Sequence, residues 1–137
     1  MIIGSIKNGI VIDHIPAGKG MELYEYLKLD GYECEIALIK NARSGKFGKK
    51  DILKLGEVID LDFDILGFIA PQITVNIIQD GECIKKLHPE LPELLTDVIK
   101  CKNPRCITSI EQELPNKFKL TDRMGRVYRC IYCDAKV

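Results

Sequence analysis

The 137-residue sequence predicts an α+β protein in two parts, a larger part of mixed strands and helices and a small β part. Two observations support this prediction. Through most of the chain, apolar residues change between the twofold period of strands and the 3.6-residue period of helices. Near the end, four cysteines occur as two close pairs separated by a hairpin-sized insert. The proline-containing segment 89–92 separates the parts, so we expect domains at residues 1–92 and 93–137.

The larger part begins with a strand, a helix and two further strands. Residues 9–15 are rich in β-branched side chains and bounded by turn residues, which predicts a strand. Apolar residues at 19–27 have helical spacing. Residues 32–39 alternate as a second strand, and 51–56 form a third. The turn-prone segment 44–48 joins these two as a hairpin.

The second half of this part adds a helix and a strand hairpin. Residues 60–69 have apolar side chains at helical spacing, with acidic residues in the first turn, where the helix dipole favours them. Residues 72–78 and 82–87 are strand-like, and Asp80-Gly81 between them is a strong hairpin signal. The order βαββαβ with one extra strand is the ferredoxin-like split βαβ arrangement, a sheet with two helices on one face.

The small part carries Cys101-x₄-Cys106 and Cys130-x₂-Cys133. Each short loop turns two sulfurs inward, and the insert brings the pairs together, as a tetrahedral thiolate site requires. Short strand-like runs in the insert are typical of a zinc-ribbon hairpin. We therefore predict one structural Zn²⁺ per chain, with these four cysteines as ligands. Four protein ligands leave no open position for catalysis.

Two other uses of these cysteines compete with a metal site. Two disulfides would suit an exported protein, but nothing in the sequence indicates export. A redox pair at Cys130 and Cys133 is less favoured, because a second pair is available to complete a metal site. The remaining Cys34 and Cys83 lie in apolar or strand-like runs, and we expect both to be small core residues.

Composition and charge narrow the function classes. No apolar run approaches about 18 residues and no signal-peptide pattern is present, so we expect a cytoplasmic protein that does not span a membrane. Residues 1–97 carry 11 basic and 16 acidic side chains, whereas residues 98–137 carry 9 and 4. The basic surplus of the small part suits a polar protein partner better than a nucleic acid.

Strand periodicity also predicts a charged sheet face. The residues that share a face by alternation are Lys50, Ile52 and Lys54 in one strand and Glu82, Ile84 and Lys86 in another. Asp13 and His14 end the first strand beside them. Such a face could hold a phosphate-bearing ligand through side chains, although the residues alone favour lysines that are merely solvated. No nucleophile accompanies Asp13 and His14, so we expect a hydrogen-bonding role there and no catalytic site.

Four motifs together closely resemble the regulatory chain of aspartate carbamoyltransferase. They are residues 11–17, 48–54 and 70–76 and the two cysteine pairs. The resemblance implies a non-catalytic chain that controls de novo pyrimidine biosynthesis. Its first domain would bind CTP, ATP or UTP and pair with a second regulatory chain. Its zinc domain would dock on the catalytic chain, within an assembly of two catalytic trimers joined by three regulatory dimers.

The resemblance also assigns residues. Asp13 and His14 would lie at the base and sugar of the nucleotide, and Lys50 near the ribose. Lys54 and Lys86 would contact the ribose and the triphosphate. The other implied pocket positions are Ile6 on the base side, Ile52, Asn76 and Ile78. Gly81 stands where an aromatic residue is expected at the pocket rim. The alternative interpretation is a zinc-ribbon protein that binds nucleic acid, and the acidic first domain argues against it.

Overall fold

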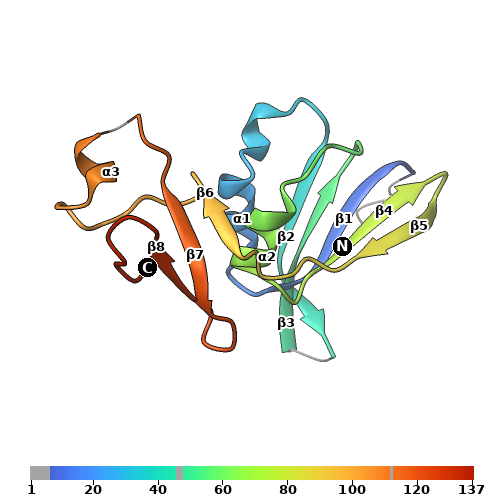
Figure 1. Cartoon of the computed structure of the whole chain (residues 1–137). Coiled ribbons are helices and arrows are strands. Elements are labelled where there is room, and N and C mark those ends of the chain that lie inside the picture. The colour runs from blue at the N-terminus through green and yellow to red at the C-terminus, as the bar shows by residue number, and fades with distance from the viewer. Residues whose placement is uncertain (1–6, 46–47, 112) are drawn as a thin grey trace. The chain divides into compact units, whose positions relative to one another are not determined.

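The computed structural model describes residues 7–45, 48–111 and 113–137. The chain divides into two compact units, Met1–Glu90 and Leu91–Val137, and each unit builds its own sheet (Figure 1). Within the described ranges, no helix is both long and apolar enough to cross a membrane.

The first unit is a five-stranded antiparallel sheet with helices on one face. Its elements are β1 Gly9–Pro16, α1 Gly20–Tyr26, the 3₁₀ turn η1 Leu29–Gly31, β2 Ile36–Ser44, β3 Gly48–Leu55, α2 Phe63–Ile69, β4 Thr74–Gln79 and β5 Glu82–Leu87. The strand order is β2-β3-β1-β4-β5, and every neighbouring pair is antiparallel. This confirms the ferredoxin-like arrangement, with β5 as the extra strand beside β4.

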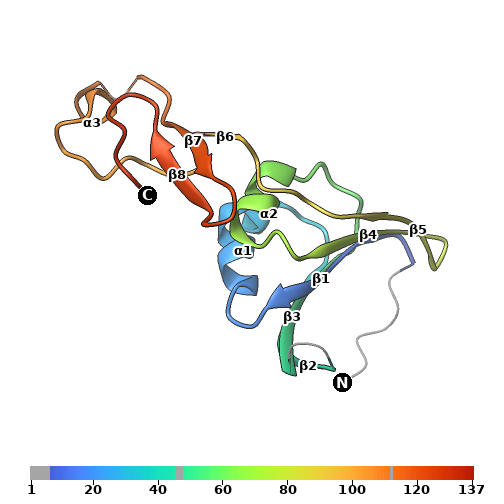
Figure 2. The ribbon, with the colours of Figure 1, turned by 60° about the horizontal axis from the view of Figure 1, so that its bottom comes forward.

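Both helices of this unit pack on the same face of the sheet (Figures 1 and 2). The buried core between them consists mainly of aliphatic side chains, which include Ile10, Ile12, Leu53, Leu55 and Val75 from the strands and Leu23, Leu66 and Ile69 from the helices. Since side chains alternate along a strand, the residues between these point to the opposite face. We call that surface the helix-free face; its members are Val11, Asp13, His14, Lys50, Ile52, Lys54, Thr74, Asn76, Ile78, Cys83 and Lys86.

The second helix starts at Phe63, three residues later than the predicted helix over 60–69. Asp62 is the N-cap residue, and its Oδ1 accepts the backbone N–H groups of Asp64 at 3.0 Å and Ile65 at 3.3 Å. The turn between β4 and β5 follows the prediction. Asp80 and Gly81 have φ values of 53° and 81°, the left-handed conformation that a two-residue type I′ hairpin turn needs at both positions.

The second strand differs from its prediction at both ends. It runs from Ile36 to Ser44 instead of 32–39. It starts later because the chain first forms the 3₁₀ turn at Leu29–Gly31 and reaches the sheet edge only at Glu35. There the carbonyl of Glu35 accepts the N–H of Gly56 at 2.7 Å. It continues past the apolar pattern because a bulge between Ile39 and Ala42 keeps the strand paired with β3.

The last strand of the sheet corrects two further expectations. Lys86 pairs with Asn76, and Cys83 pairs with Ile78, which leaves Ile84 as an extra residue between them. This bulge breaks the alternation, so Glu82 does not share a face with Lys86. The expectation that Cys83 is buried is also wrong, because β5 is an exposed edge strand. Cys34 is only partly buried and lies outside the fully buried core.

The second unit is a small three-stranded antiparallel sheet. Its elements are β6 Leu94–Thr96, the short helix α3 Ile107–Ile110, β7 Lys117–Asp122 and β8 Val127–Cys130, with strand order β6-β7-β8. Leu95, Phe118 and Tyr128 are its large buried side chains. The Tyr128 hydroxyl donates to the carbonyl of Pro92 at 2.5 Å, which ties the start of the unit to its last strand. The β hairpin is as predicted, whereas the four-residue α3 is too short to leave a periodic signal.

Candidate functional site

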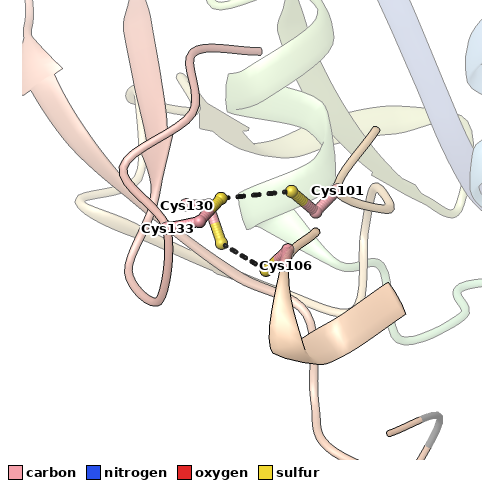
Figure 3. A group of neighbouring side chains, drawn as sticks. All are labelled: Cys101, Cys106, Cys130 and Cys133. Carbon is pink, nitrogen blue, oxygen red and sulfur yellow. Dashed lines mark hydrogen bonds between the residues drawn. The ribbon is translucent and has the colours of Figure 1, made fainter. Parts of the chain in front are cut away.

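The four cysteines of the second unit converge on one point (Figure 3). Their sulfurs all lie within 4.8 Å of one another. Cys101 Sγ lies 3.6 Å from Cys133 Sγ, and Cys106 Sγ lies 3.7 Å from Cys130 Sγ. A tetrahedron of sulfurs at the usual zinc–sulfur distance has edges of about 3.8 Å. Because a disulfide needs about 2.05 Å between sulfurs, these four free thiols have the spacing of metal ligands.

Two loops present the thiols of this four-cysteine cluster. Cys130 is the last residue of β8, and the N–H of Asp134 donates to its carbonyl at 2.9 Å, which turns Cys133 back toward it. On the other side, Asn103 closes the loop between Cys101 and Cys106. Its carbonyl accepts the N–H of Cys106 at 3.0 Å, and its Oδ1 accepts the N–H of Arg105 at 3.1 Å. This turn at Asn103 therefore directs the thiols of Cys101 and Cys106 toward the same point.

The protonation of the cluster is set by neighbouring donors and by burial. The Thr108 hydroxyl lies 3.1 Å from Cys106 Sγ and lowers the pKa of that thiol to about 6. A backbone hydrogen bond from Ala135 lowers the pKa of Cys133. Burial instead raises the pKa of Cys101 to about 12 and also raises that of Cys130. Four thiolates at this distance need a cation among them, and an all-sulfur donor set suits a soft or borderline metal ion.

Polar residues outside the cluster hold its first cysteine in place. Asn116 Oδ1 accepts the N–H of Cys101 at 3.2 Å. Asn116 is itself fixed by Asp97, since the N–H of Asn116 donates to Asp97 Oδ1 at 2.9 Å and the N–H of Asp97 donates to the carbonyl of Asn116 at 2.7 Å. The sequence did not predict that Thr108 and Asn116 contact the cysteines of the cluster. The position of Thr108, two residues after a ligand at a helix start, was a usable signal, but no local signal marks Asn116.

In the first unit, a row of four residues crosses the helix-free face. Lys54 of β3 pairs with Val11 of β1, Val11 pairs with Asn76 of β4, and Asn76 pairs with Lys86 of β5. Asn76 Nδ2 also donates to the carbonyl of Val11 at 3.2 Å. Three inter-strand steps span about 14 Å. The row therefore places two lysines at its ends, with an apolar and an amide side chain between them.

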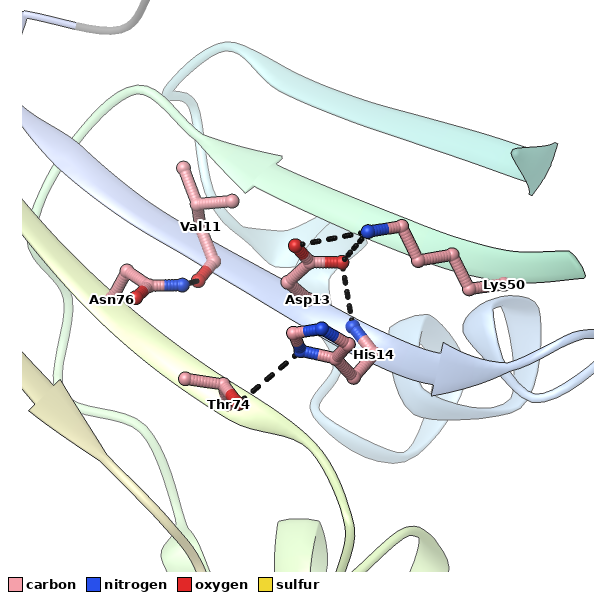
Figure 4. Close-up of polar contacts among 6 residues, drawn as sticks. All are labelled: Val11, Asp13, His14, Lys50, Thr74 and Asn76. Atoms are coloured by element: carbon pink, nitrogen blue, oxygen red, sulfur yellow. Dashed lines mark hydrogen bonds and ion pairs between the residues drawn. The ribbon is translucent and has the colours of Figure 1, made fainter. Parts of the chain in front are cut away.

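A polar cluster lies beside this row (Figure 4). Lys50 Nζ lies 3.0 Å from Asp13 Oδ1 and 3.2 Å from Asp13 Oδ2, which defines the Asp13–Lys50 pair. The N–H of His14 donates to Asp13 Oδ1 at 2.6 Å, and His14 Nδ1 lies 3.3 Å from the Thr74 hydroxyl. Burial raises the pKa of Asp13, but the hydrogen bonds from Lys50 and His14 and the Lys50 charge outweigh it, so this pKa is below its ordinary value.

A β-bulge produces the geometry of that cluster. Ile12 pairs with Leu53 and Ile15 with Asp51, so Asp13 and His14 together oppose Ile52. His14 has a left-handed φ of 60°. The extra residue turns both side chains onto the helix-free face, the re-aiming for which bulges are known near functional sites. A cavity of about 380 Å³ adjoins the cluster; its lining is His14, Pro16, Ala17, Gly48, Lys49 and Gln72.

The described residues that were predicted to contact a nucleotide all lie in the first unit. Asp13, His14 and Lys50 form the polar cluster, and Lys54, Asn76 and Lys86 belong to the row. Ile52 and Ile78 lie on the same face, whereas Ile6 lies outside the described residues. The sequence did not predict that Val11, Thr74 and Cys83 belong to this group. Cys83 Sγ lies 3.7 Å from Asn76 Oδ1. Strand register and the β5 bulge place these residues, and neither is visible in a local sequence pattern.

Comparison with known proteins agrees with the two units. The family model for the allosteric domain of the aspartate carbamoyltransferase regulatory chain matches residues 1–90, and the model for the metal binding domain of that chain matches residues 93–137. The chain belongs to the aspartate carbamoyltransferase regulatory chain family. The resemblance inferred from the motifs is thereby confirmed, and membership of this family implies a catalytic chain as partner.

Individual relatives support the same assignment. The aspartate carbamoyltransferase regulatory chain of Clostridium acetobutylicum is 53% identical over 134 residues, which cover 98% of this chain and 92% of the relative. That of Clostridium botulinum is 52% identical over the same shares. That of Bifidobacterium longum is 46% identical over 98% of this chain and 96% of the relative. The match to this family therefore extends through both units.

Proposed function

We propose that this chain is a non-catalytic regulatory subunit that binds CTP, ATP or UTP on the helix-free face and transmits their effect to the catalytic chains of aspartate carbamoyltransferase. The observation that carries the proposal is the row from Lys54 to Lys86, with the Asp13–Lys50 pair beside it. In a chain of this family, a charged face of this kind suits an anionic effector. The process under control would be de novo pyrimidine biosynthesis in the cytoplasm.

The chemistry of the face fits a nucleoside triphosphate. Lys54 and Lys86 offer ammonium groups to phosphate oxygens, and the span of about 14 Å between their strands suits a ligand of nucleotide length. Asp13 offers carboxylate oxygens to sugar hydroxyls, since Lys50 holds it charged. Val11 and Asn76 lie between the lysines, where an apolar contact and an amide can meet a base.

In the second unit, we propose that the four-cysteine cluster holds one structural Zn²⁺. Zn²⁺ suits four thiolates in a tetrahedron, and such an ion supplies folding free energy to units with small cores. Thr108 and Asn116 would orient Cys106 and Cys101 toward the ion. This unit would dock on the catalytic chain, in an assembly of two catalytic trimers joined by three regulatory dimers.

Regulation requires that an effector bind two quaternary states with different affinity. A coupling free energy of about 1–3 kcal/mol is typical of such systems. Since the proposed effector face and the proposed docking unit are separate, the change would travel as a rigid-body shift across interfaces.

An aspartate saturation curve tests this function. The matching catalytic trimer is assayed alone and with this chain, and each sample is repeated with CTP, ATP and UTP. We expect the chain to make a hyperbolic curve sigmoidal and at least one nucleotide to move its midpoint. Assembly with the trimer but no response to any nucleotide would reduce the chain to a scaffold and contradict the effector role.

A further inference from the structure

Asp51 is a buried carboxylate that no proposed role has used. It lies on β3 between Lys50 and Ile52, and its side chain points to the core face with no exposed surface. Its Oδ2 accepts the N–H groups of Gly18 at 3.1 Å and Gly20 at 3.0 Å, and its Oδ1 accepts the N–H of Asn41 at 3.0 Å. Burying a carboxylate is costly unless it is hydrogen-bonded in this way, so the three contacts are the reason it can be there.

One of the three donors, Asn41, lies in β2, and the other two, Gly18 and Gly20, follow directly after β1. In β1, Asp13 and His14 form the bulge opposite Ile52; in β2, Lys40 and Asn41 form a second bulge opposite Asp51. Asn41 has a left-handed φ of 58°, close to the 60° of His14. Each bulge has its left-handed N–H bound by a carboxylate: Asp13 accepts that of His14, and Asp51 accepts that of Asn41.

The other two contacts fix the chain directly after β1. Gly18 lies in the turn that leads from Pro16 into α1, and Gly20 is the first residue of α1. The N–H of Lys19 donates to the carbonyl of Pro16 at 2.9 Å. A Cβ on Gly20 would lie 2.8 Å from Leu38 Cδ1 and 2.9 Å from Asp51 Oδ2, closer than real Cβ contacts. A glycine is therefore required for the backbone to approach this carboxylate.

We propose that Asp51 is a positioning residue of the helix-free face. Its buried carboxylate fixes the end of β1 and the bulge of β2, which lie on either side of Lys50. It thereby holds the Asp13–Lys50 pair in register. Its side chain lies on the opposite face of β3 from Lys50 and does not touch a ligand there. It acts through the backbone. This inference rests on the proposed binding of nucleotides to the helix-free face.

The test measures CTP binding by calorimetry on the full zinc-loaded chain. Asp51→Asn replaces one of the two acceptor oxygens by an amide NH₂ group, which faces a backbone N–H, so at least one of the three contacts is lost. We expect the CTP dissociation constant to rise about tenfold. Lys50→Ala is then combined with Asp51→Asn. Because the pair is already absent in Lys50→Ala, the second change should alter the dissociation constant less than about twofold in that background.

A milder variant covers the case in which Asp51→Asn does not fold, as judged by circular dichroism. Gly18 has a φ of 95°, and a Cβ there meets nothing within 4 Å. Gly18→Ala therefore strains one of the three contacts without adding volume to the core. We expect it to weaken CTP binding about threefold, again only while Lys50 is present.

Two results would overturn the inference. Folded variants that bind CTP like the wild type would show that Asp51 does not matter to the face. An equal loss of affinity with and without Lys50 would show a general structural role and no link to the pair. Absence of CTP binding by the wild-type chain is a different result, which would overturn the proposed function and this inference with it.

Discussion

At the scale of single residues, strand β5 directs two adjacent lysines to opposite faces of the sheet. Lys85 and Lys86 are neighbours on the exposed strand β5, but Lys86 pairs with Asn76 on the helix-free face, whereas Lys85 pairs with Ile77, which packs against the core. The two lysines have the same chemistry and similar exposure, so they form a matched pair for testing which face binds the effector.

Lys86→Ala should weaken CTP binding about tenfold, because one charged contact to phosphate is lost. Lys85→Ala is the control and should change the CTP dissociation constant less than about twofold. Calorimetry on both variants measures this. Equal effects of the two substitutions would show that CTP responds only to the overall charge of β5, and would contradict a site on the helix-free face.

The Asp13–Lys50 pair predicts a dependence of stability on acid. The pKa of Asp13 is lower in the folded chain than in the unfolded one, so the pair stabilises the fold above the unfolded value of about 4 and stops doing so as pH falls through the folded value. Asp13→Asn should therefore lower the urea midpoint at pH 7. The difference from wild type should shrink below about pH 4. A difference that stays constant from pH 7 to pH 3 would contradict the assignment.

At the scale of elements, turns and bulges decide what each strand presents. The β4–β5 hairpin depends on left-handed backbone at both Asp80 and Gly81. A side chain at Gly81 would meet open space, since nothing lies within 4 Å of its ideal Cβ, so the only cost of a substitution is conformational. The left-handed φ therefore favours glycine at this position, where the family resemblance leads us to expect an aromatic residue.

Gly81→Ala should lower the free energy of unfolding by about 1 kcal/mol, because a left-handed conformation disfavours L side chains by that order. Chemical denaturation of the first unit measures it. Gly45→Ala is a suitable control, since Gly45 also faces open space and its φ is not left-handed. If both variants lose the same stability, the turn conformation is not the cause.

At the scale of the whole molecule, the two units depend on different sources of stability. The first has a core of aliphatic side chains from its sheet and both helices, whereas the second has few large buried side chains beside its four cysteines. Small domains with little core rely on metals or disulfides for stability. The units should therefore respond differently to metal removal.

Chelation of the proposed zinc should unfold residues 91–137 and release the catalytic trimer, while CTP binding by the first unit remains. Limited proteolysis maps the unfolded region, sedimentation detects free trimer, and calorimetry follows CTP. Reloading with Zn²⁺ should restore the assembly. A chelated, metal-free protein that still holds the catalytic trimers together would contradict the structural role of the metal.

The sequence predicted local features well and long-range register poorly. The cysteine spacing, the Asp80-Gly81 turn and the capped helix at Phe63–Ile69 are all set by residues close in the chain, and the structure has them. Lys50, Ile52 and Lys54 share a face as alternation predicts. Glu82 was placed on the wrong face because the bulge at Ile84 depends on the pairing with β4, and Cys83 was expected in the core because the strand order that leaves β5 at the edge has no local signal. The three donors to Asp51 come from the turn after β1, the start of α1 and the bulge of β2, which only the fold brings together.

The bulge in β5 decides which of two consecutive lysines lies opposite Asn76. If Ile84 paired regularly, every later residue would move by one position, and Lys85 instead of Lys86 would lie opposite Asn76. Because the two lysines are consecutive, an ammonium group reaches that position in either register. A change of register that removes the bulge but keeps Ile84 therefore exchanges one lysine for the other and keeps the charge. The end of the row at which we propose phosphate binding is thus insensitive to this one-residue shift.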